Sequence, residues 1–221
     1  MVSTRALDSA VIRCSACRTE LPAFDSARAF GLYTGKLRQV ILRLKFGGDE
    51  RLGARLGILL AHSWDSLLGE SEPGSTLVVP VPLHPSRRRE RGYNQSEALA
   101  VGLLRALRQR PDPPPTQIAT ALLTRRRATP PQTGLRVAAR RENLRGAFEV
   151  AKAEGVEGRC FVLVDDVMTT GATLAACANV LKHSGAKCVL ALTLARATPQ
   201  FPDFGRDEGD NDVDGLSRYS T

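Results

Sequence analysis

Three short and almost continuously apolar runs place the strongest constraint on the fold of this chain. They are STLVVPVP at 75–82, RCFVLVDD at 159–166 and KCVLALTLAR at 187–196. A strand with one face in water alternates apolar and polar residues, so runs this uniformly apolar indicate strands that are covered on both faces. Helical leucine patterns separate the runs. The sequence therefore predicts an α/β fold, with an open parallel sheet and helices on its flanks.

The segments between these runs indicate the other elements. Apolar residues at i, i+3, i+4 and i+7 between 37 and 44 predict an amphipathic helix that ends at Gly47. The arginine-rich stretch that follows 75–82 is expected to form a loop. Further helices are expected over 52–60, over 99–107 and after residue 171, and further strands over 119–125 and 146–150.

The composition divides the chain into three segments. Residues 1–30 show little regular pattern apart from one Cys-x-x-Cys pair. Residues 31–198 carry the expected core elements and begin with a small helical segment, expected to form a hood. Residues 199–221 hold six acidic residues and two arginines, which predicts a disordered acidic tail.

Composition also excludes several classes of protein. No apolar run reaches the roughly 18 residues that a membrane helix needs. Asp8 interrupts the apolar stretch at the N-terminus, which argues against a signal peptide. Five scattered cysteines do not resemble a disulfide framework. We therefore expect a cytoplasmic protein without a membrane span.

Positive charge is concentrated in the middle of the chain. The formal net charge is +8, but fourteen arginines and only four acidic residues lie between His84 and Gly146. Such a segment favours a polyanionic partner, either a nucleic acid or a small phosphorylated ligand.

The segment FVLVDDVMTTGATL at 161–174 is the most informative for function. Its strand is expected to end at Asp165 and Asp166, at the edge of the sheet where α/β proteins bind ligands. The turn that follows can direct backbone N–H groups and hydroxyls at a phosphate, while ionised carboxylates accept hydrogen bonds from a vicinal diol, directly or through Mg²⁺. A 5-phosphoribosyl group offers both. In the alternative reading, the acids and threonines only cap the strand and the helix. The residues of the turn are Thr169, Thr170, Gly171, Ala172 and Thr173.

The segment 161–174 resembles the phosphoribosyl pyrophosphate signature of type I phosphoribosyltransferases. Two further segments, VVPVPLHPSRRRERGYNQSEALA at 78–100 and TPPQTGLRVAARRENLRGAFEV at 129–150, resemble the ComF/GntX family. LRQVILRLKFGGDERLG at 37–53 fits the same family. The resemblance extends from about Cys14 to Arg196, and RGYNQ and the Q…R…N…GAF spacing are its most specific parts.

The resemblance implies roles for individual residues. Asp165 and Asp166 would hold the ribose hydroxyls as the catalytic acid pair, and the turn at 169–173 would hold the 5′-phosphate. The arginine-rich loop after the first core strand would receive pyrophosphate, and this reading is favoured over the alternative of a solvated basic face that binds nothing. Asn94 and Gln95 are either helix caps or ligand contacts. The arginines of that loop are Arg87, Arg88, Arg89 and Arg91.

The polar stretch 125–143 corresponds to the flap that closes over the substrate in this fold. Its family-matching positions are Gln132, Arg140 and Asn143, with no role assigned. Closure would exclude water while a nucleophile attacks ribose C1 and magnesium pyrophosphate departs. No residue stands out as a general base.

The N-terminus departs from the family pattern. Members usually begin with a zinc ribbon that carries two Cys-x-x-Cys pairs, and here only Cys14 and Cys17 are present. Two ligands cannot complete a structural zinc site. Either the true start lies further upstream or the zinc ribbon has decayed. Residues 1–30 are interpreted as the remnant of a zinc ribbon, and zinc binding is not expected in the chain as given.

Two functions from different classes follow. The first is a phosphoribosyltransferase that binds phosphoribosyl pyrophosphate with Mg²⁺ and transfers the phosphoribosyl group to an acceptor that the sequence does not identify. The second is a non-catalytic accessory protein of competence and DNA uptake, with single-stranded DNA or a DNA-uptake helicase as its partner. A third, a scaffold that kept the fold and lost the chemistry, is compatible with the same residues.

Overall fold

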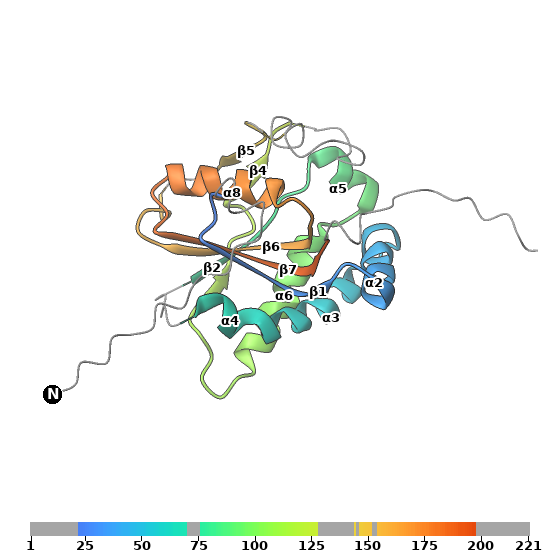
Figure 1. Ribbon diagram of the computed structural model, residues 1–221. Coiled ribbons are helices and arrows are strands. Elements are labelled where there is room, and N and C mark those ends of the chain that lie inside the picture. The colour runs from blue at the N-terminus through green and yellow to red at the C-terminus, as the bar shows by residue number, and fades with distance from the viewer. Residues whose placement is uncertain (1–21, 70–75, 128–143, 145, 152–153, 198–221) are drawn as a thin grey trace, which may run out of the picture.

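The computed structural model describes residues 22–69, 76–127, 144, 146–151 and 154–197 of the chain. This part contains both helices and strands, as Figure 1 shows. The elements are β1 (Ser26–Leu32), α2 (Gly35–Phe46), α3 (Glu50–Leu60), η1 (Ala61–Ser63), α4 (Trp64–Leu68), β2 (Thr76–Pro80), α5 (Pro85–Arg91), α6 (Gln95–Arg108), β3 (Thr116–Ile118), β4 (Leu123–Arg125), β5 (Phe148–Val150), β6 (Cys160–Met168), α8 (Ala172–His183) and β7 (Cys188–Arg196).

The main sheet has five parallel strands in the order β1-β7-β6-β2-β3. β6 is the central strand, and its Val162 lies opposite Val78 of β2 and Leu190 of β7. The predicted α/β fold with a parallel sheet is therefore confirmed. β4 and β5 form a separate antiparallel pair.

Each face of the sheet has its own hydrophobic core. Figure 1 shows α8 and the β4–β5 pair over one face, with α3, α4 and α6 on the other. Successive side chains of a strand point to opposite faces, so Phe161 and Leu163 of β6 pack into the first core and Val162 and Val164 into the second. The first part of β6, Phe161–Val164, is buried on both sides, which is why this part of the strand is uniformly apolar.

Two glycines bring α3 and α6 into backbone contact. A Cβ atom built on Gly102 would lie 1.9 Å from the carbonyl oxygen of Ala54, and one on Gly57 would lie 2.1 Å from that of Leu99. No side chain fits at either position. The contact fixes α6 against α3, and the first turn of α6 lies at the acid pair described below.

The region before residue 31 contains a strand that the sequence pattern did not predict. β1 pairs in parallel with β7 over its whole length, from Ser26 opposite Leu190 to Leu32 opposite Arg196. Its exposed and half-buried residues alternate, as expected for a strand at the edge of a sheet. The core sheet therefore starts before the expected domain boundary at residue 31.

Three other local predictions were wrong. Of the expected strand 119–125, only Leu123–Arg125 forms a strand, β4, and it pairs with β5 outside the main sheet. β6 does not end at the acid pair, because Val167 and Met168 still pair with β7. The arginine-rich segment is the helix α5 and not a loop. The His84 side chain accepts a hydrogen bond from the first turn of this helix, and Gly92 ends it at a φ of 80°.

Candidate functional site

The acid pair lies where the connections of the sheet change direction. The chain runs from β2 through α6 to β3 on one side and from β6 through α8 to β7 on the other. The order therefore reverses between β2 and β6, which is the place where open α/β sheets bind ligands. β2 pairs with β6 only as far as Pro80 opposite Val164. Asp165 and Asp166 follow directly, beside the start of α6.

Asp166 is enclosed by protein groups. Asp166 is only 4% exposed. Lys45 Nζ of α2 lies 3.2 Å from its Oδ1, and Gln95 Nε2 of α6 donates to its Oδ2 over 3.0 Å. Both carboxylate oxygens thus have a partner inside the protein, as a buried carboxylate requires.

Asp165 has a different environment. Its Oδ1 accepts hydrogen bonds from Ser96 Oγ at 3.1 Å and from the backbone N–H of Asp166 at 2.8 Å. The residue is partly exposed. Burial and the charge of Asp166 raise the pKa of Asp165 to about 7, and the amide of Asp166, the ammonium of Lys45 and the hydroxyl of Ser96 counteract part of this rise. Such a carboxyl changes charge near neutral pH, as functional acids commonly do.

Lys45 is held in place from the end of α2. The preceding residue, Leu44, is fully buried, and its carbonyl oxygen accepts a hydrogen bond from the hydroxyl of Tyr93. Burial on its own would lower the pKa of Lys45. The charge of Asp166 and smaller contributions from Tyr33 and Asp165 outweigh this effect, so the pKa is raised above its ordinary value.

The start of α6 is tied to the end of β2. Asn94 Oδ1 caps the helix by accepting from Ser96 N at 3.0 Å, and Asn94 Nδ2 donates to the carbonyl oxygen of Val81 at 3.1 Å. Gln95 contacts Asp166. Of the two roles left open, helix cap or ligand contact, the structure gives Asn94 the cap. Gln95 contacts the acid pair, and a ligand contact of Gln95 stays a prediction.

The turn after β6 leads directly into α8. Gly171 has a φ of 78°, a conformation that side-chain-bearing residues rarely adopt, and Ala172 N donates to Thr170 Oγ at 3.3 Å. Thr169, Thr170 and Thr173 are partly exposed. The expected turn is thus confirmed as a turn at a helix N-terminus. The backbone N–H groups and hydroxyls of this turn can donate hydrogen bonds to a phosphate.

The predicted pyrophosphate arginines lie on α5. Arg88 donates to both carboxylate oxygens of Glu97, at 3.0 and 3.1 Å, and the guanidinium of Arg91 lies 5.5 Å from the ring centre of Phe46. Arg89 is exposed, and Arg87 is partly exposed. Their role as a pyrophosphate site stays a prediction.

Four side chains interact with the acid pair, and the sequence did not predict these interactions. Arg125 of β4 is one of them: burial lowers its pKa and the charge of Arg87 lowers it further, while Cys177 and, to a smaller extent, Asp165 act in the opposite direction. The four residues are Lys45, Gln95, Ser96 and Arg125.

Several predicted residues lie outside the described part of the chain. They are the flap positions Gln132, Arg140 and Asn143 and the cysteine pair Cys14 and Cys17. Within the described part, no three His, Cys, Asp or Glu side chains are arranged to hold a metal ion.

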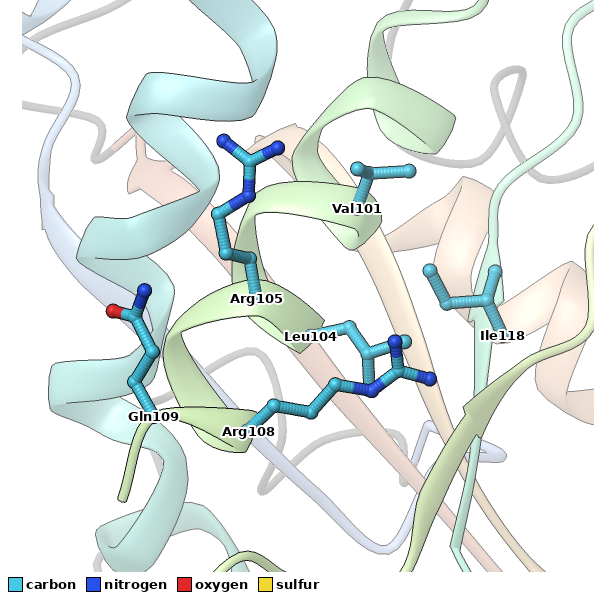
Figure 2. A pocket seen from close by; sticks show the side chains of 6 residues that line it. All are labelled: Val101, Leu104, Arg105, Arg108, Gln109 and Ile118. Atoms are coloured by element: carbon cyan, nitrogen blue, oxygen red, sulfur yellow. The ribbon is translucent and has the colours of Figure 1, made fainter.

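A cavity of about 450 Å³ lies along the second half of α6, next to β3. Figure 2 shows its six lining side chains around the end of the helix. The acid pair contacts the first turn of the same helix, so the cavity is not part of the site. Its lining residues are Val101, Leu104, Arg105, Arg108, Gln109 and Ile118.

Residues 95–212 match the family described as the phosphoribosyl transferase domain. The match includes the start of α6, the acid pair on β6 and the turn before α8. Together with the parallel sheet, it defines an α/β protein with a phosphoribosyltransferase-type domain.

Similar proteins that carry names identify the family within this class. The chain is 33% identical over 186 residues to "DNA utilization protein YhgH" of Escherichia coli (strain K12), covering 83% of this chain and 77% of the relative. It is 33% identical over 188 residues to "Competence protein F" of Haemophilus influenzae, covering 83% and 78%. "Competence protein ComFC" of Bacillus subtilis (strain 168) is 28% identical over 172 residues, covering 77% and 64%. The chain belongs to the ComF family of proteins with a type I phosphoribosyltransferase fold.

Solved structures show only a distant likeness. Glutamine phosphoribosylpyrophosphate amidotransferase from B. subtilis has a TM-score of 0.39 and 20% identity, over 66% of this chain and 26% of that chain. A hypoxanthine phosphoribosyltransferase from Staphylococcus aureus has a TM-score of 0.38 and 14% identity, over 67% and 66%. TM-scores this low support no argument about function.

None of the helices within the described ranges is long and apolar enough to cross a membrane.

Proposed function

We propose that this chain binds phosphoribosyl pyrophosphate at the acid pair and transfers its phosphoribosyl group to an acceptor. One observation carries the proposal: the acids lie at the switch point of the sheet, and the turn at 169–173 follows two residues later at the start of α8. A ligand at such a site meets carboxylate acceptors on one side and phosphate donors on the other.

Each group of the site would have a distinct task. The acid pair would orient the ribose through its hydroxyls, and the backbone N–H groups of the turn would hold the 5′-phosphate. Lys45 balances one of the two carboxylates, which lowers the repulsion that a polyanionic ligand meets there. In the transfer, the bond from ribose C1 to pyrophosphate breaks, a bond from C1 to the nucleophile forms, and pyrophosphate leaves.

Magnesium would enter with the ligand. The described residues contain no cluster of three acidic, histidine or cysteine side chains, so they do not form a protein cage for the ion. Proteins commonly bind Mg²⁺ through substrate phosphates and water. When bound, the ion would neutralise charge that develops on the departing pyrophosphate.

Calorimetric titration of phosphoribosyl pyrophosphate with Mg²⁺ tests this function. We expect micromolar binding by the wild-type protein and its loss in the Asp165→Asn/Asp166→Asn double variant. Asp65→Asn is the matched control, because Asp65 is an exposed acid whose side chain is 76% accessible and pairs with Arg110. Absence of binding by folded wild-type protein, or full binding by the double variant, would contradict the proposal.

A second candidate function is binding of single-stranded DNA without turnover. It is favoured by the names of the relatives, which refer to DNA utilization and competence, and by the arginines on α5. Binding should then weaken steeply with salt and on Arg87→Ala/Arg91→Ala, since the phosphate backbone dominates such affinities. The double acid variant should bind DNA equally well or more tightly. A salt-independent affinity would exclude this mode of binding.

A further inference from the structure

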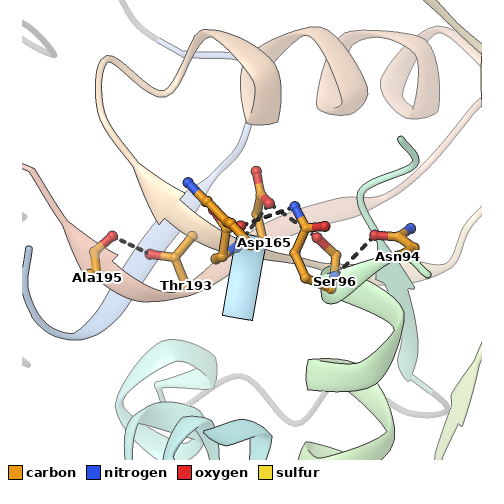
Figure 3. A network of polar contacts seen from close by, with 8 residues as sticks. Asn94, Ser96, Asp165, Thr193 and Ala195 are labelled. Carbon is orange, nitrogen blue, oxygen red and sulfur yellow. Dashed lines mark hydrogen bonds and ion pairs between the residues drawn. The ribbon is translucent and has the colours of Figure 1, made fainter. Parts of the chain in front are cut away.

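The second half of α6 borders a cavity that the proposed function does not use. The first turn of this helix lies at the acid pair, where Figure 3 shows Ser96 beside Asp165. The cavity lies along the other end of the helix, next to β3, and has a volume of about 450 Å³. Pockets that bind ligands commonly measure roughly 300 to 1,000 Å³. The cavity is therefore a second candidate binding surface.

Apolar side chains line this cavity, and two arginines extend along its edge. Leu104 is 8% exposed, Ile118 of β3 is partly exposed, and Val101 is exposed. Figure 2 shows the Arg108 side chain extending from the end of α6 past Leu104 towards Ile118. Arg105, almost one turn earlier, is exposed like Arg108. A ligand in this cavity would meet apolar surface and positive charge together.

Within the described part of the chain, these two arginines have no hydrogen bond or ion pair. Other arginines do: Arg110 pairs with Asp65 at 2.7 Å, and Arg88 pairs with Glu97 at 3.0 Å. Arginines in the last turn of a helix stabilise its dipole, but that role needs no apolar cavity beside them. A guanidinium group with free donors can bind a carboxylate through two parallel hydrogen bonds.

The segment 207–216, DEGDNDVDGL, has the complementary chemistry. It holds five acidic residues and no basic residue, and Val213 stands between Asp212 and Asp214. A segment this rich in charge has too few apolar residues to form a core of its own. An apolar residue between two carboxylates matches apolar side chains that lie beside two guanidinium groups.

The chain is long enough to bring this segment to the cavity. Pairing through β2 and β6 places Ile118 of β3 level with Leu190 of β7. Six residues of β7 and three strand spacings separate that point from Arg196, or about 24 Å at about 3.3 Å per residue and about 4.8 Å per strand. The eleven residues from Arg196 to Asp207 span about 36 Å when they are extended.

We propose that the acidic segment 207–216 of the same chain binds at this cavity, with its carboxylates on Arg105 and Arg108 and its apolar residues on the cavity lining. Exposed ion pairs are individually weak. Attachment to β7 offsets this weakness, because a short tether holds the segment at an effective concentration on the order of millimolar. The cavity is separate from the acid pair, so the inference does not depend on the proposed function.

Methyl NMR of the whole chain tests this contact. The methyl signals of the three apolar lining residues are compared between the wild type and the acid-to-amide variant Asp210→Asn/Asp212→Asn/Asp214→Asn. We expect shift changes at least about threefold larger than in Asp203→Asn, the matched control, because neutral amides lose the attraction to the arginines. Asp203 lies seven residues after Arg196, and seven extended residues span at most about 25 Å, which leaves no length to reach the arginines.

Variants of the cavity test the other side of the contact. In Arg105→Gln/Arg108→Gln, the methyl signals should no longer respond to the acid-to-amide substitutions. Arg105→Lys/Arg108→Lys keeps the charge and should keep most of the response. Arg51→Gln is the matched control, because Arg51 is exposed near the start of α3. Sodium chloride at about 1 M should move the wild-type signals towards those of the acid-to-amide variant, since it screens charges beyond about 3 Å.

Two results would overturn the inference. Identical signals in the wild type and the acid-to-amide variant would mean that the segment does not bind at the cavity, which would then be open to an acidic segment of another protein. Shift differences that grow with protein concentration would assign the cavity to the segment of a second copy. These measurements use no phosphoribosyl ligand, so failure of the proposed function would leave their outcome unchanged.

Discussion

The central strand β6 has two neighbouring acids near one end and a cysteine paired with another cysteine at the other end. The pKa of one group in each pair is raised, but to different ranges. At one end, Asp165 and Asp166 are adjacent. At the other, Cys160 lies opposite Cys188 of β7. Burial acts first and the neighbouring group second in both pairs. Together they raise the pKa of Asp165 to about 7, and the corresponding effects raise the pKa of Cys188 to about 12.

The difference shows what makes one pair a candidate site. The shift brings Asp165 into the range where it changes charge at physiological pH, and Lys45 and Ser96 keep it from rising further. The rise in the pKa of Cys188 takes this thiol out of the physiological range, and the charge of Asp25 adds to the rise. The Asp25 carboxylate has partners of its own: it accepts a hydrogen bond from Val189 N at 2.7 Å and forms an ion pair with Lys182 Nζ at 2.8 Å. Cys188 therefore stays protonated at physiological pH.

A substitution that separates α6 from α3 should have the largest effect on the acid pair. Replacing glycine by alanine within a helix ordinarily stabilises it. Here Gly102→Ala would place a Cβ atom 1.9 Å from the carbonyl oxygen of Ala54. We expect the free energy of unfolding to fall by about 3 kcal/mol or more, as overpacking against backbone does. Urea unfolding measures the change.

Val101→Ala is the matched control for this substitution. Val101 precedes Gly102 on the same helix and is 47% exposed, so its truncation should change stability by less than about 1 kcal/mol. Unchanged stability in Gly102→Ala would mean that the two helices can separate without cost. The first turn of α6 would then not be fixed at the acids by this contact.

The stability of the protein should depend on pH through Asp165. An unfolded Asp has a pKa near 3.9, and in the folded protein the pKa of Asp165 is raised to about 7. The folded state therefore binds the proton more tightly, and the free energy of unfolding falls as pH rises between these values. One pKa unit corresponds to about 1.4 kcal/mol. We expect a decrease of about 2 kcal/mol between pH 5 and pH 8 in urea unfolding.

Asp165→Asn should remove this part of the pH dependence and make the protein more stable than the wild type at pH 8. Asp65→Asn is the matched control, because Asp65 is exposed and pairs with Arg110, away from the acid pair. A slope that is identical in the wild type and in Asp165→Asn would show that Asp165 does not titrate in this range. A variant that gains stability and loses ligand affinity is the expected signature of a functional acid.

The fold was predictable where local sequence and tertiary packing agree. β2, β6 and β7 are buried on both faces, and their apolar residues indicate this without reference to the rest of the chain. β1 was not predictable, because SARAFGL mixes exposed with half-buried positions and contains few strand-favouring residues. Its pairing with β7 defines it, and that partner lies far along the chain.

The site was predictable where its residues are contiguous. The acid pair and the turn before α8 share one short segment, so their chemistry is visible in the sequence. Lys45 and Ser96 reach the acids from other elements, and a basic residue in the last turn of a helix is ordinary in any protein. Ser96 lies 69 residues from Asp165 in the chain. Local patterns carry no information about such contacts.

The thiol end offers a direct contrast with the acid end. Only the thiolate reacts with iodoacetamide, and the pKa of Cys188 is raised to about 12, so almost none is present at pH 7.5. We expect alkylation of Cys188 in the folded protein to be at least about a hundredfold slower than in the urea-unfolded chain, as followed by site-resolved mass spectrometry. Asp25→Asn should speed the reaction in the folded protein, because the charge of Asp25 contributes to the raised pKa. Equal rates in the folded and unfolded chain would mean that burial between β6 and β7 does not suppress the thiolate, and the contrast between the two ends of β6 would disappear.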